Sequence, residues 1–136
     1  MLKIQKNIEY ALLALRYIHE NQIQKSVSSK EISETLNIPY ELLSKILQRM
    51  VKSGLIVSQQ GKFGGYTLNE IPENISFGRV IASLDQKVQL TDCMFDEATK
   101  SDCKRVEGCC LRSPLSVIQN KINDLFNQTT LNEILN

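Results

Sequence analysis

Four cysteines carry the clearest chemistry of this chain, because all of them fall within one short stretch. They are Cys93, Cys103, Cys109 and Cys110, and the remainder of the 136 residues contains no cysteine. Structural disulfides are rare in a reducing cytoplasm, so a local group of thiols indicates metal binding or redox chemistry.

The spacing of the thiols favours an iron–sulfur cluster over zinc. Tetrathiolate zinc sites usually contain cysteine pairs only a few residues apart. Here nine residues separate Cys93 from Cys103, and five separate Cys103 from Cys109. The irons of a cluster spread their ligands over a larger volume, so a loop of irregular spacing can wrap around them. Zinc, a thiol redox switch and plain structural cysteines remain alternatives, and the cluster type, 2Fe–2S or 4Fe–4S, stays open.

A polar helical face after residue 39 is the second feature whose residue types suit binding. The spacing predicts a helix over 40–53 with one apolar face and one face rich in hydrogen-bond donors. Lys and Arg bind phosphates or guanine, and Gln binds adenine, so the polar face is suited to a DNA major groove. A solvated surface is the alternative interpretation. The outward candidates are Tyr40, Ser44, Lys45, Gln48, Arg49 and Lys52.

A hairpin after this helix favours DNA binding over a solvated surface. Two apolar, β-branched runs at 55–58 and 66–68 flank a glycine-rich tip, which is typical of a two-stranded hairpin. Gly64 and Gly65 would let the backbone approach a sugar-phosphate wall. Gln60 and Lys62, beside Gln59, can donate to phosphates or to the minor groove.

The elements that must position these residues follow the order of a winged helix-turn-helix domain. Apolar residues at helical spacing predict a first helix over 2–22. Ser28 and Glu31 form the pattern of a capping box, which begins a short second helix. Pro39 suits the first position of the third helix, because its missing N–H would have no partner there. Gly54 suits the position just beyond that helix.

The C-terminal half adds a helix, a loop and a second, longer helix. Ser76 begins an amphipathic helix whose apolar side completes the core. Residues 86–113 lack periodicity and are too long for an idle connection, so we expect a functional loop. Pro114 begins the final long helix, whose apolar seam predicts homodimer formation. The seam residues are Leu115, Ile118, Ile122 and Leu125.

The predicted fold is therefore mainly α, with a two-stranded wing, a cysteine-bearing loop and a long C-terminal dimerisation helix. We divide it into a DNA-binding domain at 1–85, a cluster-binding loop at 86–113, and the dimerisation helix with a C-terminal turn at 114–136. A second capping-box pattern, from Thr130 to Glu133, begins that turn.

Charge and composition narrow the class of protein. Residues 1–66 carry nine Lys or Arg against five Asp or Glu, a net +4, whereas 67–136 carry seven against ten, a net −3. A basic N-terminal part suits contact with phosphates. The absence of a signal peptide or bilayer-length apolar run predicts a soluble cytoplasmic protein with no membrane partner. No catalytic triad or Walker loop appears, and the sole histidine, His19, suits a surface or packing role, so no enzyme is expected.

The residues from Lys30 onward resemble a known family. The matching stretches are Ser53-Gly54-Leu55-Ile56, Gly64-Gly65-Tyr66-Thr67-Leu68, Leu90-Thr91-Asp92-Cys93, the later Cys103, Cys109 and Leu111, and the ending Thr130-Leu131-Asn132-Glu133-Ile134. Over nearly its whole length, the chain is similar to the iron–sulfur cluster regulators. These are winged helix-turn-helix transcription factors typified by IscR and the nitric-oxide-sensing repressor NsrR.

The resemblance implies a homodimer that binds double-stranded DNA at palindromic operators, with the third helix in the major groove and the wing in the minor groove. It places Ser44 and Lys45 at base-reading positions, and Gln60 where a wing arginine is often found. Lys62 and Phe63 depart from the commoner Pro-Gly of the wing tip. The expected DNA-binding residues are Ser29, Tyr40, Ser44, Lys45, Gln48, Arg49, Gln60, Lys62, Gly64 and Gly65.

The resemblance also implies a cluster held by Cys93, Cys103, Cys109 and a variable fourth ligand. Some members use a histidine three residues after the last cysteine, but Arg112 stands there and cannot ligate iron. Nitric-oxide-sensing members use a carboxylate near the N-terminus of the other subunit, and Glu9 aligns with it. Glu9 is therefore favoured over Cys110, with a merely solvated glutamate as the alternative.

The expected function is cluster-dependent control of transcription, most simply repression, in response to nitric oxide, redox state or the supply of iron and clusters. Gain, loss or nitrosylation of the cluster would reposition the cysteine loop and the helix after it, and so alter the geometry of the two recognition helices. The alternative is a DNA-binding regulator without a cluster that uses thiol redox chemistry or a structural zinc.

Overall fold

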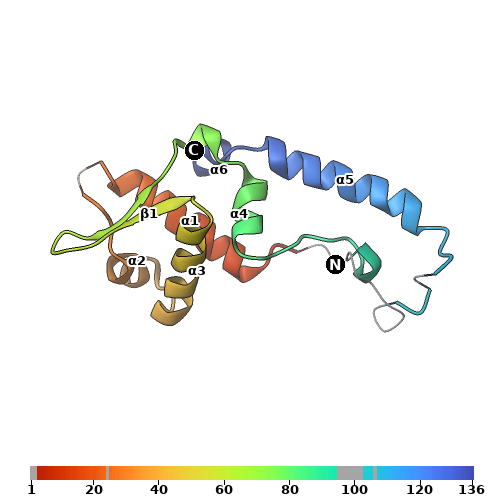
Figure 1. Ribbon diagram of the computed structural model, residues 1–136, viewed down its shortest axis with the longest axis horizontal. Helices are drawn as coiled ribbons and strands as arrows, with labels where there is room; N and C mark the ends of the chain where they lie inside the picture. Colours follow the sequence, from red (N-terminus) through yellow and green to blue (C-terminus); the bar gives the residue numbers. More distant parts are fainter. Residues whose placement is uncertain (1–2, 24, 95–102, 106) are drawn as a thin grey trace.

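The computed structural model describes residues 3–23, 25–94, 103–105 and 107–136. It is mainly helical with a two-stranded antiparallel wing, which confirms the predicted fold class. The elements in chain order are α1 (Lys6–Asn21), α2 (Ser29–Leu36), α3 (Tyr40–Lys52), β1 (Ile56–Gln59), β2 (Gly65–Leu68), η1 (Pro72–Asn74), α4 (Phe77–Ser83), η2 (Asp92–Met94), α5 (Arg112–Gln128) and α6 (Leu131–Leu135). Figure 1 shows the hairpin projecting from one end of the molecule and α5 extending toward the other.

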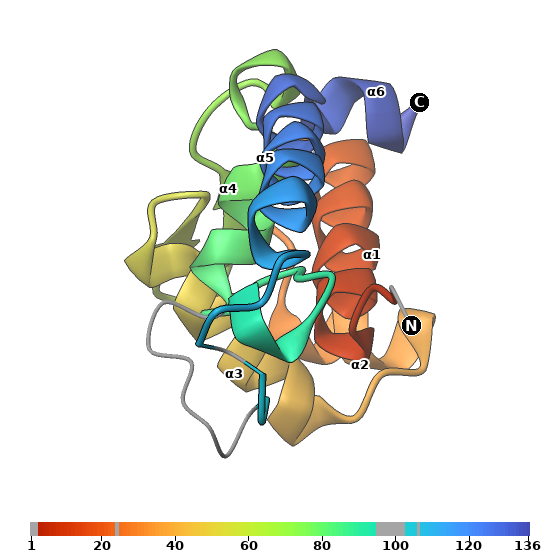
Figure 2. The same ribbon diagram turned by 90° about the vertical axis from the view of Figure 1, so that its right-hand side faces the viewer.

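We call two parts of the molecule the head and the arm. The head comprises α1 to α4 with the wing and α6. The arm comprises the cysteine segment, residues 86–111, and α5; residues 95–102 and 106 of the segment lie outside the described residues. Figure 2 looks along the molecule from the arm end, with α5 in front and α1 and α4 beside and behind it.

Two helices begin at different residues from those predicted, and Pro39 takes a different position at the start of a third. α1 begins at Lys6, and Leu2, the predicted start, lies outside the described residues. Pro39 has an extended backbone and serves as the N-cap of α3, not as its first helical residue. α5 begins at Arg112, so Pro114 falls within the first turn, where its missing N–H still needs no intrahelical partner.

The predicted capping box of α2 forms only in part. The Ser28 Oγ accepts a 3.1 Å hydrogen bond from the Glu31 N–H, as predicted. The Glu31 carboxylate instead accepts from the Tyr17 hydroxyl at 2.9 Å and pairs with Lys25 at 3.2 Å. The reciprocal bond is lost because α1 brings a competing donor to the same carboxylate.

The turn between α2 and α3 is held by its own polar groups. Asn37 adopts the left-handed conformation, with φ of 53°, which an asparagine tolerates better than most residues. The Ile38 N–H donates to the Ser33 carbonyl at 3.1 Å, and the Ser33 hydroxyl donates back to the Ile38 carbonyl at 2.7 Å. This turn sets α3 across α2 as a helix-turn-helix.

A single buried core runs through the head. The inward face of α3 packs against α1, α2 and α4, and the C-terminal turn packs into the same core. The Phe77 N–H donates to Thr129 O at 2.8 Å, and the Leu131 N–H donates to Ile75 O at 2.7 Å, so the end of the chain is tied to the start of α4. The fully buried side chains include Ile8, Leu15, Ile18, Ile32, Leu43, Leu47, Met50, Leu55, Ile75, Leu84 and Leu131.

The wing is anchored to the chain that precedes α2. Ile56 pairs with Leu68 and Gln59 with Gly65 in the antiparallel hairpin. Val27 forms an additional bridge with Tyr66 through hydrogen bonds of 3.1 and 2.7 Å. The hairpin is therefore tied through Tyr66 to the chain before α2, while its tip projects from the molecule (Figure 1).

The C-terminal end of α5 is fixed to α4. Phe126 packs edge-to-face on Phe77, with ring centroids 5.0 Å apart. A Cβ on Gly78 would collide with the side chain of Asn127, so the glycine permits this close approach. No helix in the described part of the chain is long and apolar enough to cross a membrane.

Candidate DNA-binding and cysteine sites

α3 presents the predicted polar face to solvent. Lys45, Gln48 and Arg49 are exposed, whereas Ser44 is half-buried. The opposite face buries Leu43, Ile46, Leu47 and Met50. Leu42 lies at the edge of this face and is half-buried.

Three hydroxyl groups meet where α2 and α3 begin. The Ser29 hydroxyl donates to the Tyr40 hydroxyl at 3.4 Å. Hydrogen bonds from Ser29 and then Ser44 hold the pKa of Tyr40 below its ordinary value, because they stabilise the phenolate. Hydroxyl groups beside the starts of two helices, where the helix dipoles favour negative charge, suit this corner to binding a DNA phosphate.

Arg49 connects the recognition helix to the end of α4. Its Nη1 donates a 2.8 Å hydrogen bond to the carbonyl of Leu84, a fully buried residue. Asp85, the next residue, has a left-handed backbone with φ of 52° and leads into the cysteine segment. The sequence suggested Arg49 as a DNA contact, and the structure gives its guanidinium an intramolecular partner at the junction of head and arm.

The two wing glycines have an internal reason to be glycine. A Cβ on Gly64 would lie 2.5 Å from the carbonyl oxygen of Gln59, and one on Gly65 would lie 2.6 Å from the backbone of Val27. The tight hairpin and its anchor therefore require both glycines before any DNA is considered. Their close approach to a sugar-phosphate wall stays a prediction.

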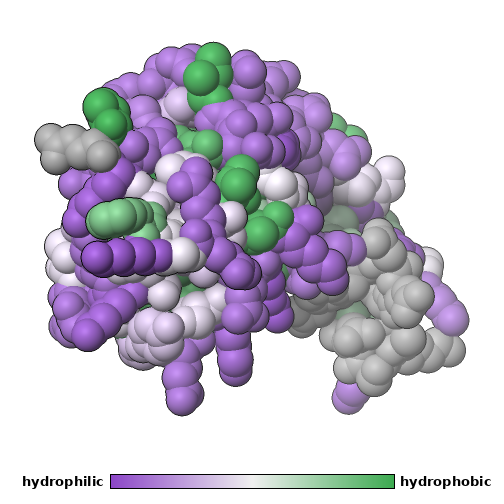
Figure 3. All heavy atoms as spheres, turned by 60° about the vertical axis from the view of Figure 1, so that its left-hand side comes forward, coloured by the Kyte–Doolittle hydropathy of each residue, from purple (hydrophilic) through white to green (hydrophobic). Residues whose placement is uncertain are grey.

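The wing tip is open to solvent and basic. Gln59, Gln60, Lys62 and Phe63 are all exposed. Figure 3 shows this side of the molecule as mainly hydrophilic, with a few separate apolar side chains. A polar surface with isolated cations suits phosphate contact better than burial against another protein.

The cysteines differ in their exposure. Cys93 is buried, Cys103 and Cys109 are half-buried, and Cys110 is exposed; all four thiols are free. The Cys93 sulfur lies 3.0 Å from the Thr91 hydroxyl oxygen. Among the described residues, no three His, Cys, Asp or Glu side chains gather closely enough to hold one metal ion.

The donor chemistry nevertheless fits an iron–sulfur cluster. Thiolates are the ligands that such clusters use, and Cys93, Cys103 and Cys109 are free thiols on one segment. Cys110 points to solvent more than its neighbour does, which agrees with adjacent cysteines serving different roles. The described cysteines are thus available as ligands.

Gln119 of α5 holds the cysteine segment. Its side chain is 7% exposed, and its Oε1 accepts from the Leu90 N–H at 2.9 Å. Its Nε2 donates to the Val88 carbonyl at 2.8 Å and to Asn123 at 3.0 Å. The amide thereby pairs with the backbone three to five residues before Cys93. Sequence inspection missed Gln119, although it lies at helical spacing between Leu115 and Phe126 on the inward face.

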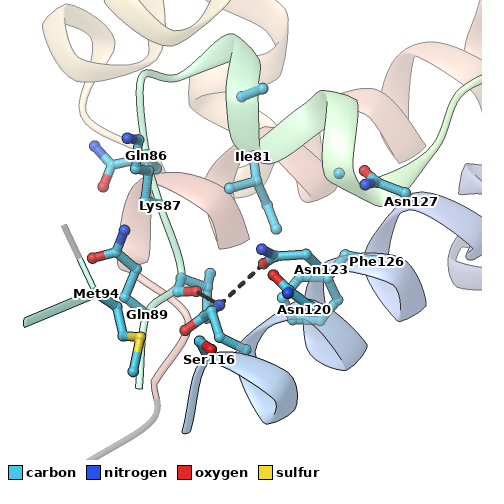
Figure 4. Close-up of a pocket in the computed structure, with 14 residues that line it drawn as sticks. Ile81, Gln86, Lys87, Gln89, Met94, Ser116, Asn120, Asn123, Phe126 and Asn127 are labelled. Carbon is cyan, nitrogen blue, oxygen red and sulfur yellow. Dashed lines mark hydrogen bonds between the residues drawn. The ribbon is translucent and has the colours of Figure 1, made fainter. Parts of the chain in front are cut away.

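A cavity of about 450 Å³ adjoins this clamp. It lies between α4, the segment around 86–89 and α5, and its lining is rich in amide side chains (Figure 4). Met94, the residue after Cys93, also borders it. Beside this cavity, the Gln119 hydrogen bonds join the segment to α5.

Glu9 lies in the first turn of α1 and is partly exposed. Its carboxylate pairs with Lys6 at 2.8 Å. The Lys6 ammonium also lies 5.4 Å from the ring centroid of Tyr10. An exposed pair of this kind contributes little stability, so the carboxylate can exchange Lys6 for another partner at low cost.

The predicted seam of α5 divides between two faces. Leu115 and Ile122 are half-buried, whereas Ile118 and Leu125 are 48% and 60% exposed. Leu111, at 59% exposure, lies seven residues before Ile118. Leu111, Ile118 and Leu125 form an apolar stripe without a partner among the described residues.

Comparison with known proteins agrees with this arrangement. Residues 4–136 match the Rrf2 family, described as iron-dependent transcriptional regulators. A relative named HTH-type transcriptional regulator IscR, from Vibrio campbellii, is 29% identical over 134 residues, which cover 98% of this chain and 77% of the relative.

Two solved structures share the fold. IscR of T. potens superposes with a TM-score of 0.74 at 22% identity, covering 98% of this chain and 86% of that one. The oxidized form of CymR from Staphylococcus aureus gives a TM-score of 0.73 at 25% identity, covering 98% of this chain and 96% of that one. The family match spans nearly the whole chain, so the protein is a transcriptional regulator of the Rrf2 family and not an enzyme.

Proposed function

We propose that this regulator is a homodimeric repressor that binds palindromic operator DNA and whose affinity for DNA is set by an iron–sulfur cluster on the cysteine segment. The observation that carries the proposal is the placement of three free thiols on a segment that α5 holds through Gln119. A protein that acts on operators works where the DNA is, so the proposal includes a cytoplasmic location.

The apolar stripe of α5 supports the homodimer. An exposed face of Leu111, Ile118 and Leu125 has the heptad spacing of a helix that packs along a second helix. Two copies related by a twofold axis would bury the same residues on both sides. The paired heads would then present two α3 helices to the two halves of a palindrome.

The DNA-binding surface joins α3, the corner of Ser29 and Tyr40, and the wing. We assign Ser44, Lys45 and Gln48 to the major groove, since they lie on the outward face of α3. Ser29 and Tyr40 are assigned to a phosphate. The wing completes the contact through Gln60, Lys62, Gly64 and Gly65. Arg49, near the C-terminal end of α3, supports the helix through its hydrogen bond to Leu84.

We assign Cys93, Cys103 and Cys109 as cluster ligands, with Glu9 of the partner subunit as the fourth. When bound, the cluster would supply redox-active iron able to respond to nitric oxide, redox state or iron supply. Cys93 would take up a sulfur–iron bond in place of its contact with Thr91. A ligand from the partner would link the sensing site to the dimer interface.

Two side chains support coupling between the cysteine segment and DNA. Gln119 joins the segment before Cys93 to α5. Arg49 joins α3 to Leu84, just before the same segment begins. A shift of the cysteine segment would therefore break or rearrange both sets of hydrogen bonds. The positions of the dimerisation helix and of the recognition helix would change with it.

Anaerobic reconstitution with iron and sulfide tests the cluster. We expect visible absorption and bound iron and sulfide in the wild-type protein, and loss of both in Cys93→Ser, Cys103→Ser and Cys109→Ser. Cys110→Ser is the matched control and should keep the wild-type spectrum. Reconstituted wild-type protein without iron or sulfide would reject the proposal. A Glu9→Ala variant with an unchanged spectrum and stability would remove Glu9 from the ligand set.

A thiol redox regulator without a cluster is the second candidate. Free cysteines adjoin one another at Cys109 and exposed Cys110, and the S. aureus relative has been solved in an oxidized form. This candidate predicts colourless protein after anaerobic purification, with DNA affinity that changes on mild thiol oxidation and recovers on reduction. A zinc-stabilised regulator predicts bound zinc and no such change.

A further inference from the structure

The wing ends in an aromatic side chain that nothing in the described structure covers. Phe63 is 83% exposed, although exposing a phenylalanine forfeits the stabilisation that burial gives. The Lys62 ammonium lies 5.8 Å from its ring centroid. The tip thus presents a flat apolar ring beside a positive charge.

The backbone around Phe63 is held in one conformation. The Ser26 hydroxyl donates to the Phe63 carbonyl, and the Gly64 N–H donates to the Gly61 carbonyl at 3.0 Å. Gly61 supplies the positive φ of 110° that the turn requires. The ring is therefore carried on a turn that is already formed, so binding would not have to order this backbone.

The wing also lies where it can reach the groove beside α3. Tyr66 of β2 forms a bridge with Val27, which directly precedes Ser28, the N-cap of α2, so the wing lies beside the helix-turn-helix. The tip projects away from the molecule beyond this anchor (Figure 1). With α3 in the major groove, as proposed above, the tip is the part of the wing that meets the adjacent minor groove.

We propose that Phe63 is a wedge that enters the minor groove and partly unstacks one base step, with Lys62 binding the adjacent phosphate. This inference rests on DNA binding by the wing. Apolar side chains that enter the minor groove commonly act in this way and kink the duplex. The contact makes the wing a reader of DNA deformability, because flexible pyrimidine–purine steps open most easily.

Selection of duplexes from a random-sequence pool tests the wedge directly. Wild-type protein should enrich a pyrimidine–purine step on each outer flank of the selected site, and Phe63→Ala should select the same central bases without that step. On the wild-type duplex, Phe63→Ala should weaken binding on the order of ten-fold, as for the loss of one stacking contact. Circular dichroism checks that the variant folds.

Two controls separate the wedge from other contacts. Ile71 is also exposed but lies beyond the base of the wing, and Ile71→Ala should bind as the wild type does. Lys62→Ala should reduce the salt dependence of binding by about one phosphate contact, whereas Phe63→Ala should leave it unchanged. Equal affinity for Phe63→Ala, or weaker binding with the flanking step still enriched, would overturn the wedge. Failure of the wild type itself to bind any duplex would instead refute the proposed function.

Discussion

The head and the arm are held by different kinds of contact. A continuous buried core, shared by α1 to α4 and α6, holds the head. The described part of the arm is joined to α4 by contacts that include the Phe77–Phe126 pair, borders a cavity, and leaves an apolar stripe exposed. The head is therefore packed on all sides around one core, whereas α5 packs along one side and leaves the other open to a partner.

The largest expected effect is on the core of the head. Leu47→Ala removes a fully buried side chain of α3, and we expect the free energy of unfolding to fall by about 2–5 kcal/mol. Urea denaturation at one fixed protein concentration measures it. If Asn120→Ala, exposed on α5 away from the stripe, cost as much under the same conditions, the distinction between head and arm would fail.

Dimer formation should be the next most sensitive property. Ile118→Glu places a charge in the middle of the α5 stripe, and we expect the dimer dissociation constant to rise on the order of a hundred-fold, because that charge would be buried without a partner. Sedimentation equilibrium measures the constant. Ser113→Glu, exposed on the same helix but away from the stripe, is the control and should leave the dimer intact.

Removal of the Gln119 side chain should lower the free energy of unfolding less than the core substitution does. It should also reduce the effect of the cluster on DNA affinity. Gln119→Ala leaves the Val88 carbonyl and Leu90 N–H without their partner, at a cost of about 1–3 kcal/mol. Hydrogen exchange should show faster exchange at Leu90 while α3 keeps its protection. Exchange that increased equally in α3 would show that head and arm unfold as one unit.

The smallest expected effect concerns the acid sensitivity of the C-terminal turn. Hydrogen bonds from the Thr130 N–H and then its hydroxyl hold the pKa of Glu133 below its ordinary value of 4.5. A lowered folded-state pKa gives stability that is present above pH 4.5 and is lost as the pH falls through the folded-state value. Glu133→Gln should therefore loosen α6 at neutral pH and match the wild type in acid, by hydrogen exchange. A difference that persisted in acid would contradict this assignment.

Local chemistry made most of the head predictable from sequence. The hydroxyl caps Ser28, Ser76 and Thr130 each begin a helix, and Gly54 takes the left-handed conformation, with φ of 81°, just after α3. These signals act between residues near one another in the chain. They do not depend on how the chain is folded elsewhere.

The arm and the junction could not be predicted in the same way. Arg49 finds its partner at Leu84, 35 residues away, and a backbone carbonyl has no signature in sequence. Gly65 is required by Val27, which the hairpin pattern does not indicate. The heptad spacing of α5 identified its apolar residues but not which of them face α4 and which face solvent. Such contacts depend on tertiary packing, which periodicity alone does not specify.

The ratio of DNA dissociation constants between cluster-loaded and cluster-free protein tests the central claim most directly. Both forms would be prepared without air and titrated against a duplex selected by the wild type at one salt concentration. We predict a ratio that differs from one by about ten-fold or more and that shrinks in Gln119→Ala. Equal affinity of the two wild-type forms would contradict the account, because the arm would then hold a cluster without controlling the head.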